Sequence, residues 1–169
     1  MNRAGAIKKV TLGKEVRICD LVAVARYSAT VGFDEDYQKR VSDDRDLVEQ
    51  FVKENRRIYG ITTGVGDNVK RIIPESEATT YQENILLTHC TTVGEPMDRE
   101  GIRAIMFVML TNMGSGYTGV RLVLLEKIAA MLNQDVSPWA HQHGSVGYLG
   151  VEAHIALVLL GKGREIGRA

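Results

Sequence analysis

Gly144-Ser145-Val146-Gly147-Tyr148-Leu149-Gly150 carries a glycine at every third position. Glycine inside a helix costs about 1 kcal/mol relative to alanine, so we expect a loop here that allows close backbone approach. The apolar residues 151–160 should form the helix that follows. Backbone N–H groups of such a loop can bind an anion, but no Lys-Ser/Thr pair follows and no β-branched strand precedes. A structural turn between two packed helices is the alternative.

Composition describes an ordinary globular protein of about one domain, which we assign to residues 1–169. The chain is 44% apolar and 25% charged, with a net charge of zero. Such a balance gives no electrostatic reason to expect a nucleic-acid or membrane partner. Cys19 and Cys90 form no disulfide framework, and the first residues lack the apolar core of a signal peptide. We therefore expect a cytoplasmic protein.

Apolar residues recur at helical spacing through most of the chain, and we see no convincing strand and no internal repeat. The expected helices cover 18–27, 34–55, 75–91, a segment capped by Asp98, and 122–133. In the helix at 18–27, one face should carry Ile18, Leu21, Val22 and Ala25. In the helix at 75–91, one side should carry Tyr81, Ile85, Leu86 and His89. The methionine-rich stripe from Ile102 to Leu110 is more typical of core than of a cofactor site. The sequence thus predicts a mainly α domain with ligand-type loops at 58–67, 114–119 and 144–150.

The loop at 58–67 places Tyr59 among three glycines and two threonines. Gly64 and Gly66 permit positive φ, so the tyrosine can approach a ligand closely. A packed amphipathic side chain is the alternative to a catalytic base.

Three histidines, His141, His143 and His154, lie close in sequence with Glu152 among them. His-x-His spacing can chelate zinc where the chain is extended. Glu152 and His154 are two residues apart, however, and would face different ways on a helix. The sequence therefore favours loop or surface histidines, and we predict no metal site.

Several short motifs follow one another in an order more informative than any single one. They are Tyr59-Gly60-x-x-Thr63-Gly64-x-Gly66, Gln82-x-Asn84-x-Leu86, Thr88-His89, Val93-Gly94-Glu95-Pro96, Gly116-Tyr117-Thr118-Gly119-Val120-Arg121, Leu132-Asn133 with Val136 and Pro138, Gly144-Ser145-Val146-Gly147, and His154 in the following helix. This order resembles the histidine and phenylalanine ammonia-lyase family. The resemblance runs from about Val10 to Gly163.

The resemblance implies a helical bundle, usually a homotetramer with shared active sites, which eliminates ammonia from an aromatic amino acid. It implies that Tyr59 is the base that removes the β-proton. It also implies that His89 lies beside the substrate ring, with Gly60, Thr63 and Asn84 as further substrate-binding residues. The Thr88-His89 pair is similar to the Ser-His pair of histidine-specific members, which favours a polar ring. Because a β-proton is barely acidic and tyrosine ordinarily has a pKa near 10, the reaction needs an activated substrate and a stabilised phenolate.

The family's electrophile, methylidene-imidazolone, forms from an Ala-Ser-Gly triplet directly after Gly-Ser-Val-Gly. Here Tyr148-Leu149-Gly150 occupies that position, and about three residues are missing before His154. Leucine has no hydroxyl to lose as water, so we predict that this prosthetic group is absent. The asparagine, glutamine, arginine and glutamate site residues that come later in the longer family members have no counterpart here, and Thr62 and Val65 replace a usual asparagine and phenylalanine.

Three hypotheses follow. In the first, this chain is one subunit of a split lyase-like enzyme, with Tyr59 as general base and a second polypeptide supplying the remaining fold. In the second, it is a non-catalytic binding or structural subunit of a hetero-oligomer. In the third, it is a histidine ammonia-lyase fragment whose electrophile comes from a partner chain. All three predict exposed apolar faces and an obligate hetero- or homo-oligomer, and the enzymatic ones predict a small-molecule substrate.

Overall fold

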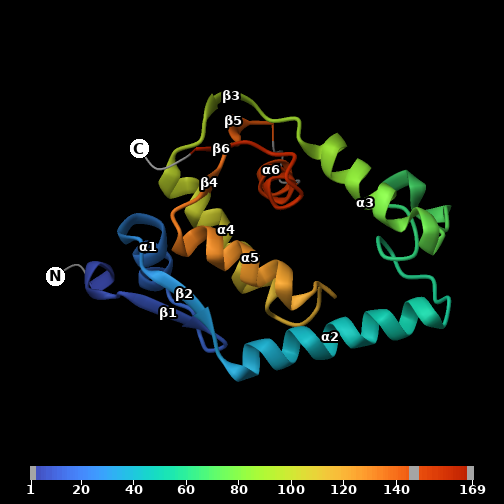
Figure 1. Ribbon diagram of the computed structural model, residues 1–169, viewed down its shortest axis with the longest axis horizontal. Coiled ribbons are helices and arrows are strands. Elements are labelled where there is room, and N and C mark those ends of the chain that lie inside the picture. Colours follow the sequence, from blue (N-terminus) through green and yellow to red (C-terminus); the bar gives the residue numbers. More distant parts are fainter. Residues whose placement is uncertain (1–2, 145–148, 167–169) are drawn as a thin grey trace.

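The computed structural model describes residues 3–144 and 149–166, and it is mainly helical (Figure 1). The described α-helices are α1 (Ile18–Tyr27), α2 (Glu35–Lys53), α3 (Glu75–His89), α4 (Arg99–Met113), α5 (Leu122–Asn133) and α6 (Gly150–Leu159). The strands are β1 (Lys9–Leu12), β2 (Thr30–Phe33), β3 (Val93–Pro96), β4 (Ser137–Pro138), β5 (His141–His143) and β6 (Glu165–Ile166). Two 3₁₀ helices cover Arg3–Ala6 and Gly66–Lys70. The expectation of a mainly α fold is confirmed.

The core forms where α4 packs against α1 and α5. The predicted stripe on α4 is confirmed, because Ile102, Met106 and Leu110 are fully buried. Asp98 caps this helix as expected, accepting a hydrogen bond from the backbone N–H of Gly101 at 2.7 Å. Helical periodicity therefore located the centre of the fold correctly.

The predicted face of α1 was wrong in part. Ile18 is 81% exposed, whereas Ala23 and Val24 are completely buried. Small side chains allow α1 to approach α4 closely, so the contacting face is set by size as well as by hydrophobicity.

The expectation that the chain has no strand was also wrong. β1 and β2 pair in parallel, with Lys9 opposite Thr30. The side-chain amide of Asn133, at the end of α5, accepts from the N–H of Val31 at 2.8 Å and donates to its carbonyl at 2.9 Å. A strand of four residues shows too little alternation of apolar and polar side chains to be recognised from the sequence. The side chain of Asn133, far away in sequence, also binds this pair of strands.

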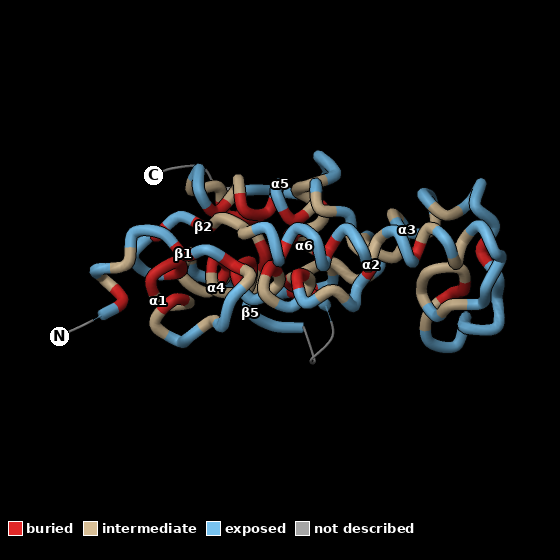
Figure 2. Tube along the Cα trace, turned by 90° about the horizontal axis from the view of Figure 1, so that it is seen from below, coloured by how far each residue is buried: buried red, intermediate tan, exposed pale blue. Residues whose placement is uncertain are grey.

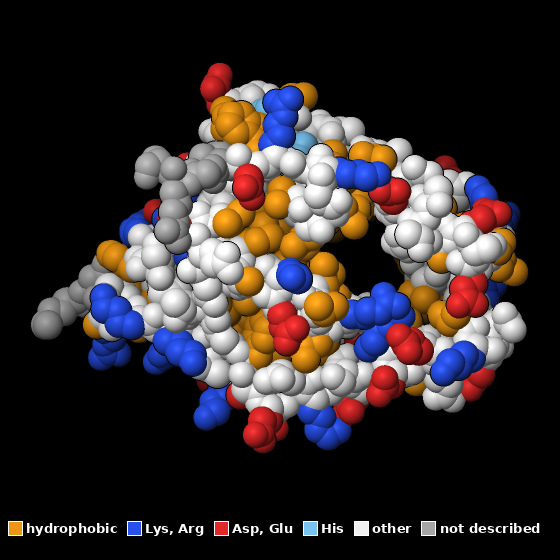
Figure 3. All heavy atoms as spheres, in the orientation of Figure 1, with side chains coloured by type: hydrophobic (Ala, Val, Ile, Leu, Met, Phe, Trp, Pro, Cys, Tyr) orange, Lys and Arg blue, Asp and Glu red, His pale blue; other side chains and the backbone are white. Residues whose placement is uncertain are grey.

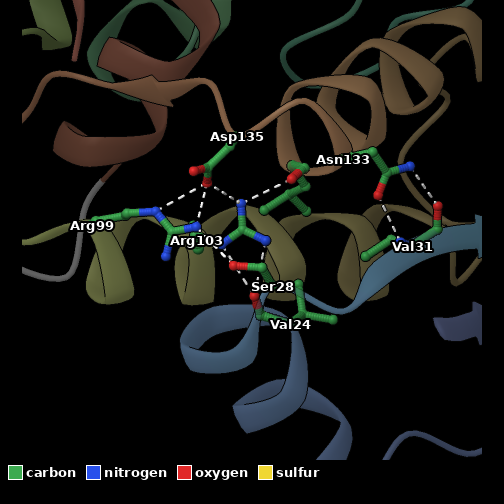
Figure 4. Close-up of polar contacts among 8 residues, drawn as sticks. Val24, Ser28, Val31, Arg99, Arg103, Asn133 and Asp135 are labelled. Carbon is green, nitrogen blue, oxygen red and sulfur yellow. Dashed lines mark hydrogen bonds and ion pairs between the residues drawn. The ribbon is translucent and has the colours of Figure 1, made fainter. Parts of the chain in front are cut away.

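Arg103 is a charged residue inside the core (Figure 4). Its guanidinium donates two hydrogen bonds to the carbonyl of Val24, at 2.9 and 3.1 Å, and one to that of Leu132, at 2.8 Å. It also contacts the Asp135 carboxylate at 3.2 Å. Burial lowers the pKa of Arg103 from its ordinary value. One side chain thus ties together α1, α4 and the end of α5.

Residues 54–89, which we call the arm, extend away from the rest of the described chain, which we call the body. The long helix α2 leads out to the loop at 54–74, and α3 returns toward the body (Figure 1). Figure 3 shows an opening through the molecule between the arm and the body. Buried residues concentrate in the body, with only short buried segments in the loop (Figure 2).

The loop at 114–119, one of the three predicted ligand-type loops, packs against α2. A Cβ at Gly114 would meet the Tyr37 ring at 1.9 Å, so only glycine fits there. The backbone N–H of Gly119 donates to the Asp44 carboxylate, and the Arg45 guanidinium donates to the Gly119 carbonyl at 3.2 Å. These glycines allow the loop to approach α2 closely, and contact of the loop with a ligand stays a prediction.

Across the part of the chain that the structure describes, no helix is both long and apolar enough to cross a membrane.

Candidate active site

Tyr59 lies on the loop at 54–74, and its side chain is 61% exposed. Its phenolic oxygen accepts a hydrogen bond from the backbone N–H of Gly66 at 3.0 Å. Gly66 has a φ of +57°, a left-handed conformation that glycine adopts at little cost. The loop therefore presents a reachable phenolic oxygen that already receives one backbone donor.

A second tyrosine fastens the same loop to α3. The hydroxyl of Tyr81 accepts from the N–H of Val65 at 3.1 Å, so the N–H groups of consecutive residues bind two different tyrosine oxygens. The Gln82 amide also contacts the carbonyl of Gly60 at 3.4 Å. These contacts fix the segment that carries the Gly66 donor.

Thr63 stabilises the turn from inside. It is 2% exposed; its hydroxyl donates to the Gly64 carbonyl at 2.9 Å and lies 3.3 Å from the backbone N–H of Gly60. A Cβ at Gly64 would meet the carbonyl oxygen of Asn68 at 2.4 Å, so the turn requires glycine there. Gly60 and Thr63 therefore act in this structure as supports of the loop.

A cavity of about 510 Å³ lies at the other end of α3, between α3, α4, α5 and α6. Its walls are mostly aliphatic side chains and methionines, and its polar lining residues are His89, Asn112 and Glu152. Figure 3 shows hydrophobic side chains gathered beside the opening, on the side of the body. An apolar chamber of this volume with a few polar groups is typical of small-molecule sites.

His89 and Leu149 line this cavity together. The Nδ1 atom of His89 lies 2.6 Å from the carbonyl oxygen of Ile85. Because a carbonyl only accepts, that nitrogen carries the proton. The histidine and the middle position of the altered triplet, 60 residues apart in sequence, thus share one chamber.

The other candidate residues lie elsewhere. Tyr59, Gly60 and Thr63 do not line the cavity, and Asn84 is exposed on α3. Tyr81, which holds the Tyr59 loop, and His89 are eight residues apart on α3, or about 12 Å along its axis. The described residues therefore form two separate groups, with α3 joining them.

Leu149 and Gly150 of the altered triplet begin helix α6. Tyr148 lies outside the described residues. Leu149 is the N-cap with a φ of +49°, and Gly150 is the first, buried residue of the helix. The left-handed conformation costs a leucine roughly 1–2 kcal/mol. Methylidene-imidazolone does not fit these residues, because Leu149 carries no hydroxyl at the central position.

Two of the three histidines form a partly buried polar cluster around the buried Thr92. The Thr92 hydroxyl lies 2.9 Å from Nε2 of His154 and accepts from the backbone N–H of His141 at 3.2 Å. The indole N–H of Trp139 donates to His141 at 3.3 Å. Burial and the neighbouring His141 lower the pKa of His154 below its ordinary value of 6.5. His143 is exposed on β5, and the described residues contain no group of three potential metal ligands.

The sequence did not indicate the cavity, the hydrogen bond between Val65 and Tyr81, or the Thr92 cluster. The spacing of Ile85, Leu86 and His89 on α3 did indicate one shared face. The opposite wall of the cavity comes from α4, α5 and α6. The apolar periodicity of these helices predicted core packing and gave no sign of a cavity.

Comparison with known proteins assigns the family. Residues 16–168 match the family model of the aromatic amino acid lyases. Histidine ammonia-lyase from Streptococcus sanguinis is 37% identical over 90% of this chain and 30% of its own length. The crystal structure of ergothionase from Treponema denticola superposes with a TM-score of 0.89 at 28% identity, covering 93% of this chain and 32% of that one.

A third similarity concerns histidine ammonia-lyase from Trypanosoma cruzi, with a TM-score of 0.85 at 29% identity over 93% of this chain and 31% of that one. This chain therefore spans about a third of the length of the relatives that it matches. The match nevertheless covers nearly all of the chain, which belongs to the aromatic amino acid lyase family.

Proposed function

We propose that this chain supplies the proton-accepting part of an ammonia-lyase-like active site that works without methylidene-imidazolone. The observation that carries the proposal is the hydrogen bond from the Gly66 N–H to the Tyr59 phenolic oxygen, 3.0 Å long, on an exposed glycine loop. A general base must be reachable, and a backbone donor aimed at its oxygen helps to hold that oxygen in position.

In the proposed reaction, the Tyr59 phenolate takes a proton from a carbon of the substrate. The electrons of that C–H bond form a carbon–carbon double bond. In an elimination, a neighbouring leaving group then departs with its bonding pair. In an isomerisation, the new double bond replaces an existing one, whose π electrons take the proton back at another carbon. An aromatic or unsaturated acid is the substrate class that suits the apolar cavity with His89 in its wall.

Leu149 supports the proposed absence of the prosthetic group. Because no hydroxyl stands at this position, we expect the intact mass of the chain to equal that of its encoded sequence. A mass deficit from dehydration at residues 148–150 would contradict this part of the proposal.

We further propose that a second polypeptide covers the open cavity, in a hetero- or homo-oligomer with a tetramer-like core. The exposed large apolar side chains Val108, Leu149 and Leu160 support this, since such surface normally marks an interface. Pull-down of the tagged chain followed by light scattering tests it. A monodisperse monomer without a partner would contradict it.

Tyr59→Phe is the decisive variant for catalysis. It removes the proton acceptor and keeps the ring, so turnover by the assembled complex should fall roughly 10²- to 10⁴-fold. The matched control is Tyr117→Phe, because that tyrosine is 89% exposed in the loop beside α2 and should tolerate the change.

The alternative is a non-catalytic subunit, which the loss of the serine at position 149 favours. Undiminished turnover in the Tyr59→Phe complex would establish that alternative. A fragment whose electrophile comes from a partner chain would instead give a urocanate- or cinnamate-type absorbance when mixed with that partner.

A further inference from the structure

We propose that the outer edge of β1 binds an extended, acidic segment of another polypeptide, which adds to the two-stranded sheet as a third strand. This edge lies apart from the Tyr59 loop and from the cavity between α3, α4, α5 and α6, so the inference goes beyond the proposed function. It rests on the hydrogen bonding of the two strands and on the charge of the segment that contains β1.

The strands β1 and β2 use alternate residues to bind each other. The backbone N–H of Thr30 donates to the carbonyl of Lys8 at 3.0 Å, and Lys9 lies opposite Thr30. In a parallel pair with this register, the peptide groups of Lys9 and Thr11 point away from β2. Within the part of the chain that the structure describes, no hydrogen bond reaches these outward groups.

The two edges of this strand pair differ. On the outer side of β2, the Asn133 amide binds both backbone groups of Val31, and α5 packs beside the strand. On the outer side of β1, Lys9 and Thr11 are exposed, and Figure 1 shows β1 as the outer of the two strands. An unpaired edge of this kind is the surface to which extended peptides add as further strands.

The charge around β1 indicates which kind of segment suits this edge. Residues 3–14 contain Arg3, Lys8, Lys9 and Lys14 and no Asp or Glu. All four basic residues are exposed, and none of them forms an ion pair among the described residues. A second copy of β1 would bring lysines close to lysines, which is unfavourable across paired strands. An acidic strand brings opposite charges together instead.

A purely protective role for the lysines makes a different prediction. Lysine on an exposed edge strand also keeps sheets of different molecules from pairing. In that case the edge would bind neither acidic nor basic peptides. Peptide probes of equal length and opposite charge therefore separate the two roles.

The experiment measures binding of fluorescein-labelled hexapeptides to the full chain by fluorescence anisotropy. One probe alternates valine with glutamate, and a second alternates valine with lysine. At low salt we expect the glutamate peptide to bind roughly tenfold more tightly, and we expect its affinity to fall at high salt because ions screen exposed charges. A third probe, the fully N-methylated glutamate peptide, keeps the charge but has no backbone donor, so it should not bind.

Two variants test the edge and its charge separately. Thr11→Pro removes an N–H that points away from β2, a position at which edge strands tolerate proline, and it should abolish binding of the glutamate peptide. Lys9→Glu reverses one charge and should weaken binding of that peptide by roughly threefold or more. Lys127→Glu makes the same charge change at an exposed position of α5 and should leave the affinity unchanged.

Absence of binding by the glutamate peptide would overturn the proposal, as would equal affinity for the two charged peptides. Binding that survives N-methylation would also overturn it, because the basic residues would then attract any polyanion, such as a nucleic acid, by charge alone. If Thr11→Pro fails to fold, the N-methylated probe still tests the edge in the unmodified chain. These readouts do not involve Tyr59 or turnover, so failure of the proposed catalysis would leave them unaffected.

Discussion

The body and the arm of this molecule are held together by different interactions. In the body, α4 and α5 bury side chains such as Phe107 and Ile128, which are at most 1% exposed. In the arm, none of the described residues of α3 is buried. The loop at 54–74 closes on backbone hydrogen bonds, such as that from the Ile73 N–H to the Thr62 carbonyl, 3.0 Å long.

This difference matters because the proposed base lies in the weaker region. Burial of apolar surface stabilises the body, whereas exposed backbone hydrogen bonds open readily. We infer that the proposed second chain, by covering the arm, would hold Tyr59 more firmly than the arm alone does. Catalysis and assembly would then be linked through this loop.

The largest effect on stability should come from removing the buried hydrogen bonds that Arg103 makes in the body. Arg103→Met leaves the carbonyls of Val24 and Leu132 without their buried donor, and we expect a loss of about 3 kcal/mol in the free energy of unfolding. Urea denaturation followed by circular dichroism measures it. Arg26→Met, which removes an exposed ion pair with Glu100, is the control. Equal losses for the two variants would show that burial of Arg103 contributes nothing.

A smaller effect on stability should follow from removing one hydrogen bond in the arm. Tyr81→Phe removes the oxygen that receives the Val65 N–H, a hydrogen bond with a net contribution of about 1 kcal/mol. We expect faster hydrogen exchange at the amides of Val65 and Gly66 and a reduced kcat with little change in KM. The urea midpoint of the body should stay constant. A lower midpoint with unchanged exchange would contradict the separation of arm and body.

The smallest effect concerns His154, where α6 meets the strand region. Its folded pKa lies below its ordinary value, so the unfolded chain binds more protons as pH falls. Stability from this group is therefore present above about pH 6.5 and is lost as pH falls through that value toward the folded pKa. The urea midpoint at pH 7.5 should exceed that at pH 5.5. His154→Gln should reduce this difference, and His143→Gln, at an exposed site, should not.

A second acid effect should be separable from this one. The Arg17 side chain, by hydrogen bonding to Asp20, lowers the pKa of that carboxyl below its ordinary 3.8. Its contribution is present above that value and disappears only at lower pH. The urea midpoint of His154→Gln should fall less between pH 7.5 and pH 5.5 than that of the unmodified chain. An equal fall in both proteins would show that a group other than His154 titrates in this range.

Local sequence predicted much of the helical structure. The expected helices at 18–27 and 122–133 match α1 and α5 at both ends, and Asp98 starts α4 as expected. Capping residues and apolar periodicity act within a few residues, so they can be read locally. The ordered motifs also identified the family.

Long-range contacts could not be predicted in this way. The parallel strands depend on Asn133, about 100 residues away in sequence from the strand it binds, and Arg103 depends on carbonyls of two other helices. The cavity likewise needs four helices to exist. Tyr59 and His89 belong to two separate groups in the described residues, and their roles stay predictions.

The two helices that lead to and from the Tyr59 loop set its distance from the cavity. With 19 residues in α2 and 15 in α3, these rods are about 28 and 22 Å long. The lengths of the two helices set the position of the loop, because an opening separates the arm from the body beside them (Figure 3). Removing the last helical turn of α2 and the first turn of α3 would shorten the reach by about 5 Å and would leave the buried Tyr37, Val41 and Val48 of α2 in place. The lengths of α2 and α3 would then determine how long a substrate must be to reach from the Tyr59 loop to the cavity.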